Sequence, residues 1–192
     1  MADYTKIIDF WIKKIGPNGW YNGPVELDQT IRDRFQNDWE AAKAGDFSDW
    51  KETPDGCLGY LILTDQFPRN MFRNDPRAFV TDPLARAVAS FAIEKDFDLQ
   101  VDPIAQEFFY LPFEHSEEMA DQNLCETYIK NRMDNADNSL LHARAHQQII
   151  RQFGRFPYRN IPLGRDTTEA EQLFLDQNGY MGIIQDLENR GS

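Results

Sequence analysis

The chain has 192 residues, of which 41% are apolar, and a formal net charge of −12. This length and composition allow one substantial buried core. The acidic balance excludes general nucleic-acid binding, because affinity for phosphates needs a basic face. No apolar run approaches the ~20 residues needed to cross a bilayer, and the N-terminal segment lacks the layout of a secretory signal. We therefore expect a cytoplasmic protein with one domain over residues 1–192 and no membrane partner.

Hydrophobic residues recur at helical spacing nearly throughout the chain, and no convincing strand is present. Asp3 is a predicted N-cap, and Thr81 and Thr168 are predicted caps, Thr168 as part of a capping box with Glu171. Pro112 either kinks one helix or separates two. Turns are predicted at residues 16–19 and 22–24, and a loose tail at about 188–192. The predicted helices cover approximately residues 4–15, 26–45, 56–67, 82–95, 103–133, 139–153 and 169–174.

One motif occurs twice, as Phe-Pro-Arg-Asn at residues 67–70 and Phe-Pro-Tyr-Arg-Asn at residues 156–160. Each copy gathers arginine, asparagine and an aromatic ring around a proline after an apolar helical run, which suits holding a ligand. Residues 151–165 contain four arginines and no acid, and the arginine fork fits a carboxylate or phosphate. The candidate ligand-binding residues are Asp65, Gln66, Arg69, Asn70, Arg73, Arg155, Arg159 and Asn160.

The first copy also has an architectural interpretation. Helical spacing places Asp65 on the apolar face, so it needs a partner, for which Arg69 or Arg73 is available. Pro68 lacks the backbone N–H that would continue the helix, so the motif is expected to begin at a helix C-terminus. In one interpretation the pair fixes the loop and presents Gln66 and Asn70 at its rim. In the other, it only joins the helix end to its neighbour.

A second candidate site lies in residues 111–117, where two carboxylates, an imidazole and a hydroxyl are crowded beside aromatic residues. A carboxylate beside a histidine suits general acid–base chemistry near neutral pH. The candidate catalytic residues are His115 and Glu117, together with His146, which lies before the second motif copy. The alternative is a capped helix start with exposed acids.

Metal and cysteine chemistry are weakly indicated. His142 and His146 stand four residues apart on a helical face, a spacing that can bind a metal, but a hydrogen-bonded helix histidine is the commoner outcome. We predict no metal site, and the sequence identifies no cofactor. Cys57 and Cys125 have no metal or redox spacing and are expected to be reduced and partly buried.

Several ordered motifs together resemble a bacterial family catalogued as domain of unknown function 924. They lie at residues 63–73, 81–84, 110–117 and 151–160, and the resemblance covers nearly the whole chain. It implies an all-α, tetratricopeptide-like fold of stacked antiparallel helix pairs, and it carries no activity. The chain departs from the family at His142, where an aromatic residue is usual, and at Tyr158, where many relatives have histidine.

Two functions from different classes remain open. The first is a pocket in which the arginines hold an anionic small molecule while His115, Glu117 and His146 supply polar or proton-transfer chemistry. The second is a tetratricopeptide-like scaffold that binds a peptide or a partner protein. No phosphate loop, nucleophile elbow or dinucleotide fingerprint is present, so the sequence leaves open whether the protein is an enzyme.

Overall fold

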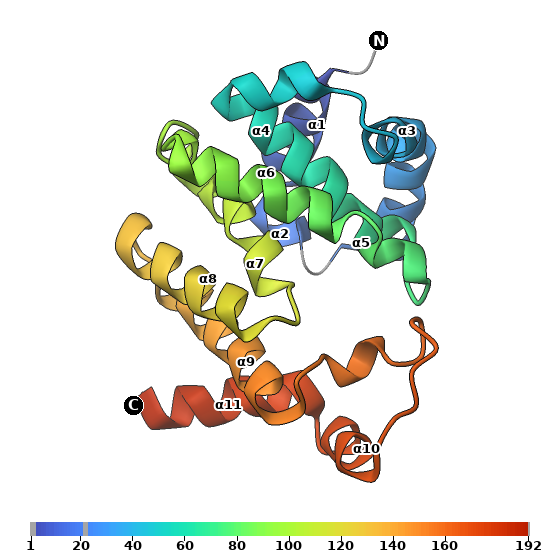
Figure 1. The fold of residues 1–192 in the computed structure, drawn as a ribbon, viewed down its shortest axis with the longest axis vertical. Coiled ribbons are helices and arrows are strands. Elements are labelled where there is room, and N and C mark those ends of the chain that lie inside the picture. Colours follow the sequence, from blue (N-terminus) through green and yellow to red (C-terminus); the bar gives the residue numbers. More distant parts are fainter. Residues whose placement is uncertain (1–2, 21–22, 192) are drawn as a thin grey trace. The chain divides into compact units, whose positions relative to one another are not determined.

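The computed structural model describes residues 3–20 and 23–191, and over these residues the chain forms helices and connecting turns without a strand (Figure 1). The all-α prediction is therefore confirmed. None of the described helices is both long and apolar enough to span a membrane. The chain divides into two compact units, unit 1 (Met1–Pro112) and unit 2 (Phe113–Ser192), and each is described by itself. One domain over the whole chain stays a prediction.

Unit 1 contains α-helices, 3-10 turns and two π-helical segments. Its elements are α1 (Tyr4–Ile8), η1 (Asp9–Ile15), α2 (Pro17–Trp20), α3 (Val25–Lys43), η2 (Ser48–Glu52), α4 (Pro54–Leu61), η3 (Ile62–Gln66), α5 (Phe67–Met71), η4 (Pro76–Phe79), α6 (Asp82–Glu94), η5 (Phe97–Leu99) and η6 (Pro103–Phe109).

The first predicted helix is confirmed, with its second half widened into the π-helical η1. A carboxylate oxygen of Asp3 accepts the Thr5 N–H at 2.9 Å, which confirms the predicted N-cap. Gly16 ends the segment with φ of 67°, a conformation that favours glycine. The turn predicted at residues 16–19 is wrong for its second part, because Pro17 starts the short helix α2, where a missing N–H costs nothing. In the turn predicted at 22–24, Asn22 lies outside the described residues.

The prediction that Pro68 ends the third helix is wrong. The chain passes from α4 through η3 into α5 without leaving a helical path. At the end of η3 the backbone N–H of Phe67 reaches the carbonyl oxygen of Ile62, five residues back. Pro68 then stands in the first turn of α5, where a backbone N–H has no helical partner to lose.

Thr81 precedes α6 as predicted, but its side chain does not cap the helix. Its buried hydroxyl accepts the indole N–H of Trp39 at 3.0 Å and donates to the carbonyl oxygen of Thr64 at 2.6 Å. Both hydrogen-bonding roles of the hydroxyl are thereby used in the core, which explains why the cap is lost.

Phe67, the aromatic residue of the first motif copy, is part of the core of unit 1. Its ring centroid lies 4.9 Å from that of Phe35, 5.4 Å from that of Trp11 and 6.3 Å from that of Phe10. Aromatic pairs at these separations add to the stability gained by burial. The first residue of the motif is therefore held in place by core packing.

Unit 2 follows a break in the helix that was predicted over residues 103–133. Pro112 lies in the short α7 (Leu111–Glu114), and a separate helix follows, so the segment is divided rather than kinked. The later elements are α8 (Met119–Arg132), α9 (Asp137–Phe153), η7 (Pro157–Arg159), α10 (Glu169–Asp176) and α11 (Gly179–Gly191).

Helix ends in unit 2 agree with the sequence except at the C-terminus. Gly154 follows α9 with φ of 68°, and the capping box of Thr168 and Glu171 opens α10. Both predictions are confirmed. The loose tail predicted at residues 188–192 is replaced over 188–191 by the end of α11, a helix that was not predicted, and Ser192 lies outside the described residues.

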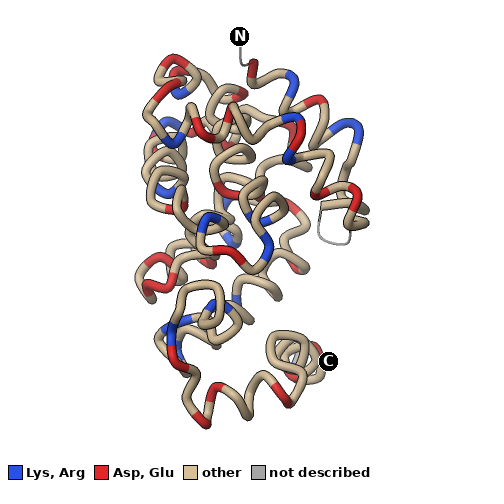
Figure 2. Tube along the Cα trace, turned by 90° about the vertical axis from the view of Figure 1, so that its right-hand side faces the viewer, with Lys and Arg blue, Asp and Glu red and all other residues tan. Residues whose placement is uncertain are grey.

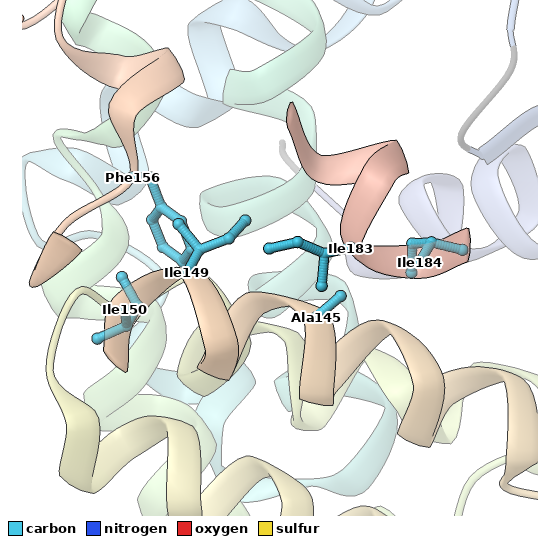
Figure 3. Packing of buried hydrophobic residues seen from close by; sticks show 6 residues of the cluster. All are labelled: Ala145, Ile149, Ile150, Phe156, Ile183 and Ile184. Atoms are coloured by element: carbon cyan, nitrogen blue, oxygen red, sulfur yellow. The ribbon is translucent and has the colours of Figure 1, made fainter. Parts of the chain in front are cut away.

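The apolar core of unit 2 joins α9, α11 and the aromatic residue of the second motif copy (Figure 3). Its buried members are Ala145, Ile149, Ile150, Phe156, Ile183 and Ile184. Both motif copies thus place their first aromatic side chain in the core of their own unit.

Candidate functional site

In the first motif copy, the Arg69 guanidinium lies between two buried carboxylates. Nη1 is 3.2 Å from Oδ1 of Asp65, and Nη1 and Nη2 each donate at 3.1 Å to one oxygen of Asp82. Nη1 also donates to the backbone carbonyl of Asp65 at 2.5 Å. The predicted pairing of Asp65 with Arg69 is confirmed.

The other polar side chains of this copy gather at Asp28 of α3. Arg73 donates to both carboxylate oxygens of Asp28, with Nη2 at 3.0 Å from Oδ1, and Asn70 Nδ2 donates to the same oxygen at 2.9 Å. Gln66 Nε2 in turn donates to Asn70 Oδ1 at 3.3 Å. Gln66 and Asn70 are buried inside this network, so they do not form the rim that one of the two interpretations gave them. Their amide groups are drawn inward because the buried carboxylate needs donors.

Asp28 was missed as a member of this network, although the sequence contains a signal for it. The residue lies three positions before Ile31 and seven before Phe35, so it shares the apolar face of α3. An acid on such a face needs a partner.

In the second motif copy, Arg155 is held by Glu171 of α10. Nε donates to Oε1 at 2.6 Å, and Nη2 donates to Oε2 and to the Asp166 carbonyl oxygen, each at 2.8 Å. Asn160 Nδ2 also donates to Oε2 of Glu171 at 3.3 Å. The hydrogen bonds from Arg155 lower the pKa of Glu171 from its ordinary value of 4.5 to about 2.

Glu117, a predicted catalytic residue, holds the loop between α9 and α10. Its oxygens accept from Arg165 at 2.9 and 2.8 Å, and Oε1 also accepts the backbone N–H of Phe156 at 2.9 Å. Burial would raise the pKa of Glu117, but the Arg165 hydrogen bond and the Phe156 N–H hold it below its ordinary value. Arg159 is buried, and its Cζ lies 4.4 Å from the Phe156 ring centroid.

The two copies therefore use their arginines in a similar way. Arg69, Arg73 and Arg155 each pair with a carboxylate of their own unit, and acidic and basic positions are interspersed along the trace (Figure 2). The copies belong to different units, so a pocket shared by both stays a prediction. The role of these residues in ligand binding likewise stays a prediction.

All three histidines of the chain lie around one buried carboxylate, that of Glu114 at the end of α7. Oε1 of Glu114 is 3.0 Å from Nδ1 of His146, and Oε2 is 4.0 Å from Sγ of Cys125. Burial would raise the pKa of Glu114, but its neighbours hold it below its ordinary value, His146 most strongly and then His115 and His142. Glu114 is thus ionised at neutral pH.

The rings around His146 pack closely. Its ring centroid lies 4.9 Å from that of Tyr180, 5.5 Å from that of Phe156 and 6.3 Å from that of His115. His146 therefore contacts the second motif copy through Phe156. We call Glu114, the three histidines and Tyr180 the histidine cluster.

His142 and Tyr180 complete the cluster from α9 and α11. The Tyr180 hydroxyl and Nδ1 of His142 form a short hydrogen bond. Burial lowers the pKa of His142, and burial followed by the charge of Glu114 raises the pKa of Tyr180, so both side chains are neutral near pH 7. Tyr180 was missed because α11 was not predicted, although Tyr180, Ile183, Ile184 and Leu187 have helical spacing.

The described residues contain no group of three or more His, Cys, Asp or Glu side chains with the geometry to hold a metal ion. Cys57 and Cys125 are unpaired with each other and buried, as predicted. Burial raises the pKa of both thiols, so they remain protonated at neutral pH.

The profile of the family described as bacterial protein of unknown function, DUF924, matches residues 7–179. The chain belongs to this family. It is also similar to a solved structure of a protein of unknown function from Agrobacterium tumefaciens, with 38% identity and a TM-score of 0.84. That match covers 91% of this chain and 97% of the other. No curated protein matches the chain.

We predict that Arg69→Ala lowers the free energy of unfolding by about 3 to 5 kcal/mol, because two buried carboxylates lose their shared cation. Lys13→Ala is the matched control, since the ion pair of Lys13 with Asp9 is exposed, and it should change stability little. Urea unfolding followed by circular dichroism measures both values. If Arg69→Ala lowers the free energy of unfolding as little as the control does, a structural role for the Arg69 guanidinium is contradicted.

Glu171 should make the stability of the protein depend on pH. Its pKa in the folded state is depressed to about 2, so its stabilising effect is present above its ordinary pKa of 4.5 and is lost as the pH falls towards 2. The stability difference between wild type and Glu171→Gln should therefore be largest near neutral pH and shrink on acidification. Glu169→Gln, an exposed position in the same helix turn, should give a small and nearly constant difference. Urea unfolding at a series of pH values tests this.

Proposed function

We propose that the protein binds a small anionic molecule at the histidine cluster of unit 2. The observation that carries this proposal is the gathering of all three imidazoles around the buried Glu114. Three polar rings from α9 and the segment after α7 are held together at the cost of burying a carboxylate. An apolar core would need none of these groups.

The second motif copy supplies a cation close to this cluster. The guanidinium of Arg159 lies over the Phe156 ring, and that ring packs against His146. A buried guanidinium attracts an anion strongly, because the surrounding protein screens its charge less than water does. These contacts support an anion beside the imidazoles, with His115 as a donor to it and His146 next to it.

We propose an architectural role for the remaining candidate ligand-binding residues. Asp65, Gln66, Arg69, Asn70 and Arg73 contact one another and further carboxylates of unit 1. Arg155, Asn160 and Glu117 likewise hold the loop between α9 and α10. Their contacts support an architectural contribution, in which they fix the elements that carry the ligand-binding groups.

A tetratricopeptide-like scaffold remains the alternative. It would need exposed residues along helix faces to bind a peptide, and unit 2 does expose Leu173 of α10 and Met181 of α11. The polar residues of both motif copies, however, are engaged inside their own units. We therefore place the small-molecule function first. The cytoplasmic location and the tetratricopeptide-like relationship stay predictions.

The binding proposal is tested by thermal shift of the wild-type protein with inorganic phosphate, malonate and citrate. A ligand that binds the folded state stabilises it by about 2.7 kcal/mol at a hundred times its dissociation constant. We expect at least one anion to raise the melting temperature of the wild type, and His146→Asn to reduce that rise.

Arg144→Gln is the matched control, because Arg144 lies on the same helix in an exposed pair with Glu126. It should keep the full response to the anion. If the three anions raise the melting temperature of wild type and His146→Asn equally, or raise neither, binding at the histidine cluster is refuted.

A further inference from the structure

The hydrogen bonds of His146 determine which ring nitrogen carries a proton. Nδ1 lies 3.0 Å from the carbonyl oxygen of His142 and 3.0 Å from Oε1 of Glu114. A carbonyl oxygen only accepts hydrogen bonds, and an ionised carboxylate does the same. Nδ1 of His146 therefore carries a hydrogen shared between two acceptors. In the neutral ring, Nε2 then has the lone pair.

The ring of His146 is also fixed in position. Tyr180, Phe156 and His115 pack around it. Two acceptors on Nδ1 further restrict rotation of the ring about its bond to Cβ. A side chain held by packing and by hydrogen bonds presents its free atom in one orientation, which proton-transfer sites need.

The described residues leave Nε2 of His146 without a hydrogen-bond partner, whereas Nδ1 has two. The Tyr180 ring packs against His146, but its hydroxyl is hydrogen-bonded to His142. Cys125, the thiol near the cluster, is directed to Oε2 of Glu114. The lone pair of Nε2 is therefore a basic position that the cluster offers to another molecule.

We propose that His146 is a general base whose Nε2 takes a proton from a hydroxyl group of the bound molecule, and that Glu114 is its positioning residue. This rests on the proposed function and narrows the ligand to a small anionic molecule that carries a hydroxyl. The O–H bond of the ligand breaks, the N–H bond at Nε2 forms, and the electron pair stays on the oxygen. The imidazolium is stabilised by the Glu114 carboxylate at Nδ1, and the reverse step returns the proton to the ligand oxygen.

Two measurements without ligand test the pairing of His146 with Glu114. The first is the ¹⁵N NMR shifts of the wild-type imidazoles near neutral pH, where we expect His146 to have its proton on Nδ1 and not on Nε2. The second is the pH dependence of the rate at which diethyl pyrocarbonate acylates His146, followed by mass spectrometry. In that reaction Nε2 attacks a carbonyl carbon, an ethoxycarbonyl group is transferred, and carbon dioxide and ethanol are released.

Glu114→Gln separates a positioning role from a packing role. Glutamine keeps the size and one acceptor oxygen but removes the charge that stabilises the imidazolium. The pH–rate profile for His146 should then move to lower pH, because Glu114 no longer stabilises the imidazolium through its charge. Glu126→Gln, which alters the exposed pair with Arg144, should leave the profile in place.

A wild-type His146 with its proton on Nε2 overturns the proposal, and so does an unmoved profile in a folded Glu114→Gln variant. If that variant does not fold, the wild-type tautomer alone decides. Because no anion is present in either measurement, a failure here is distinct from a failure of anion binding in the thermal-shift test.

Discussion

An ionised carboxylate removed from water has to be surrounded by donors, and unit 2 is arranged around this requirement at Glu114. His146 comes from α9 to donate to it, and Cys125 comes from α8 to approach its second oxygen. Tyr180 brings α11 to the same place through His142. Removing the charge would leave these polar rings in an apolar setting without the group that holds them. The cluster is therefore a single electrostatic unit rather than three independent histidines.

The same requirement explains the two copies of the proline motif. In each copy the first aromatic residue enters the core, and the arginine nearby pairs with an acid that the fold has buried. Arg69 meets Asp65 and Asp82, whereas Arg155 meets Glu171. The repeated motif thus meets the same physical requirement twice, which is to satisfy buried carboxylates beside an aromatic residue of the core.

These arrangements bear on function in different ways. In the arginine networks each charge is matched by an opposite charge and by several hydrogen bonds, so they rigidify the chain. At the histidine cluster, Glu114 fixes one side of the His146 ring and leaves the other nitrogen for chemistry. This orientation is the basis of the proton-transfer role that we propose for His146.

Much of the helical path was predictable because it depends on local spacing and capping. Asp3, Gly154 and the Thr168 capping box all act within a few residues of their own position. The prediction failed at Pro68. A π-helical segment of five residues precedes it, and Pro68 stands in the first turn of the next helix, where its missing N–H breaks no hydrogen bond. It also failed at Thr81, whose hydroxyl is used by two residues far away in sequence.

The amino-acid order alone is enough to predict the all-helical class, most helix positions, the family and the need of Asp65 for a nearby arginine. Each of these depends on the order of residues or on contacts one helical turn apart. The packing of the helices is needed to see that Arg73 pairs with Asp28 and that His146 pairs with Glu114 rather than Glu117. The contact of Tyr180 with His142 also depends on this packing. Pairings between separate helices depend on how their faces dock, and that docking is not encoded in any short stretch of the chain.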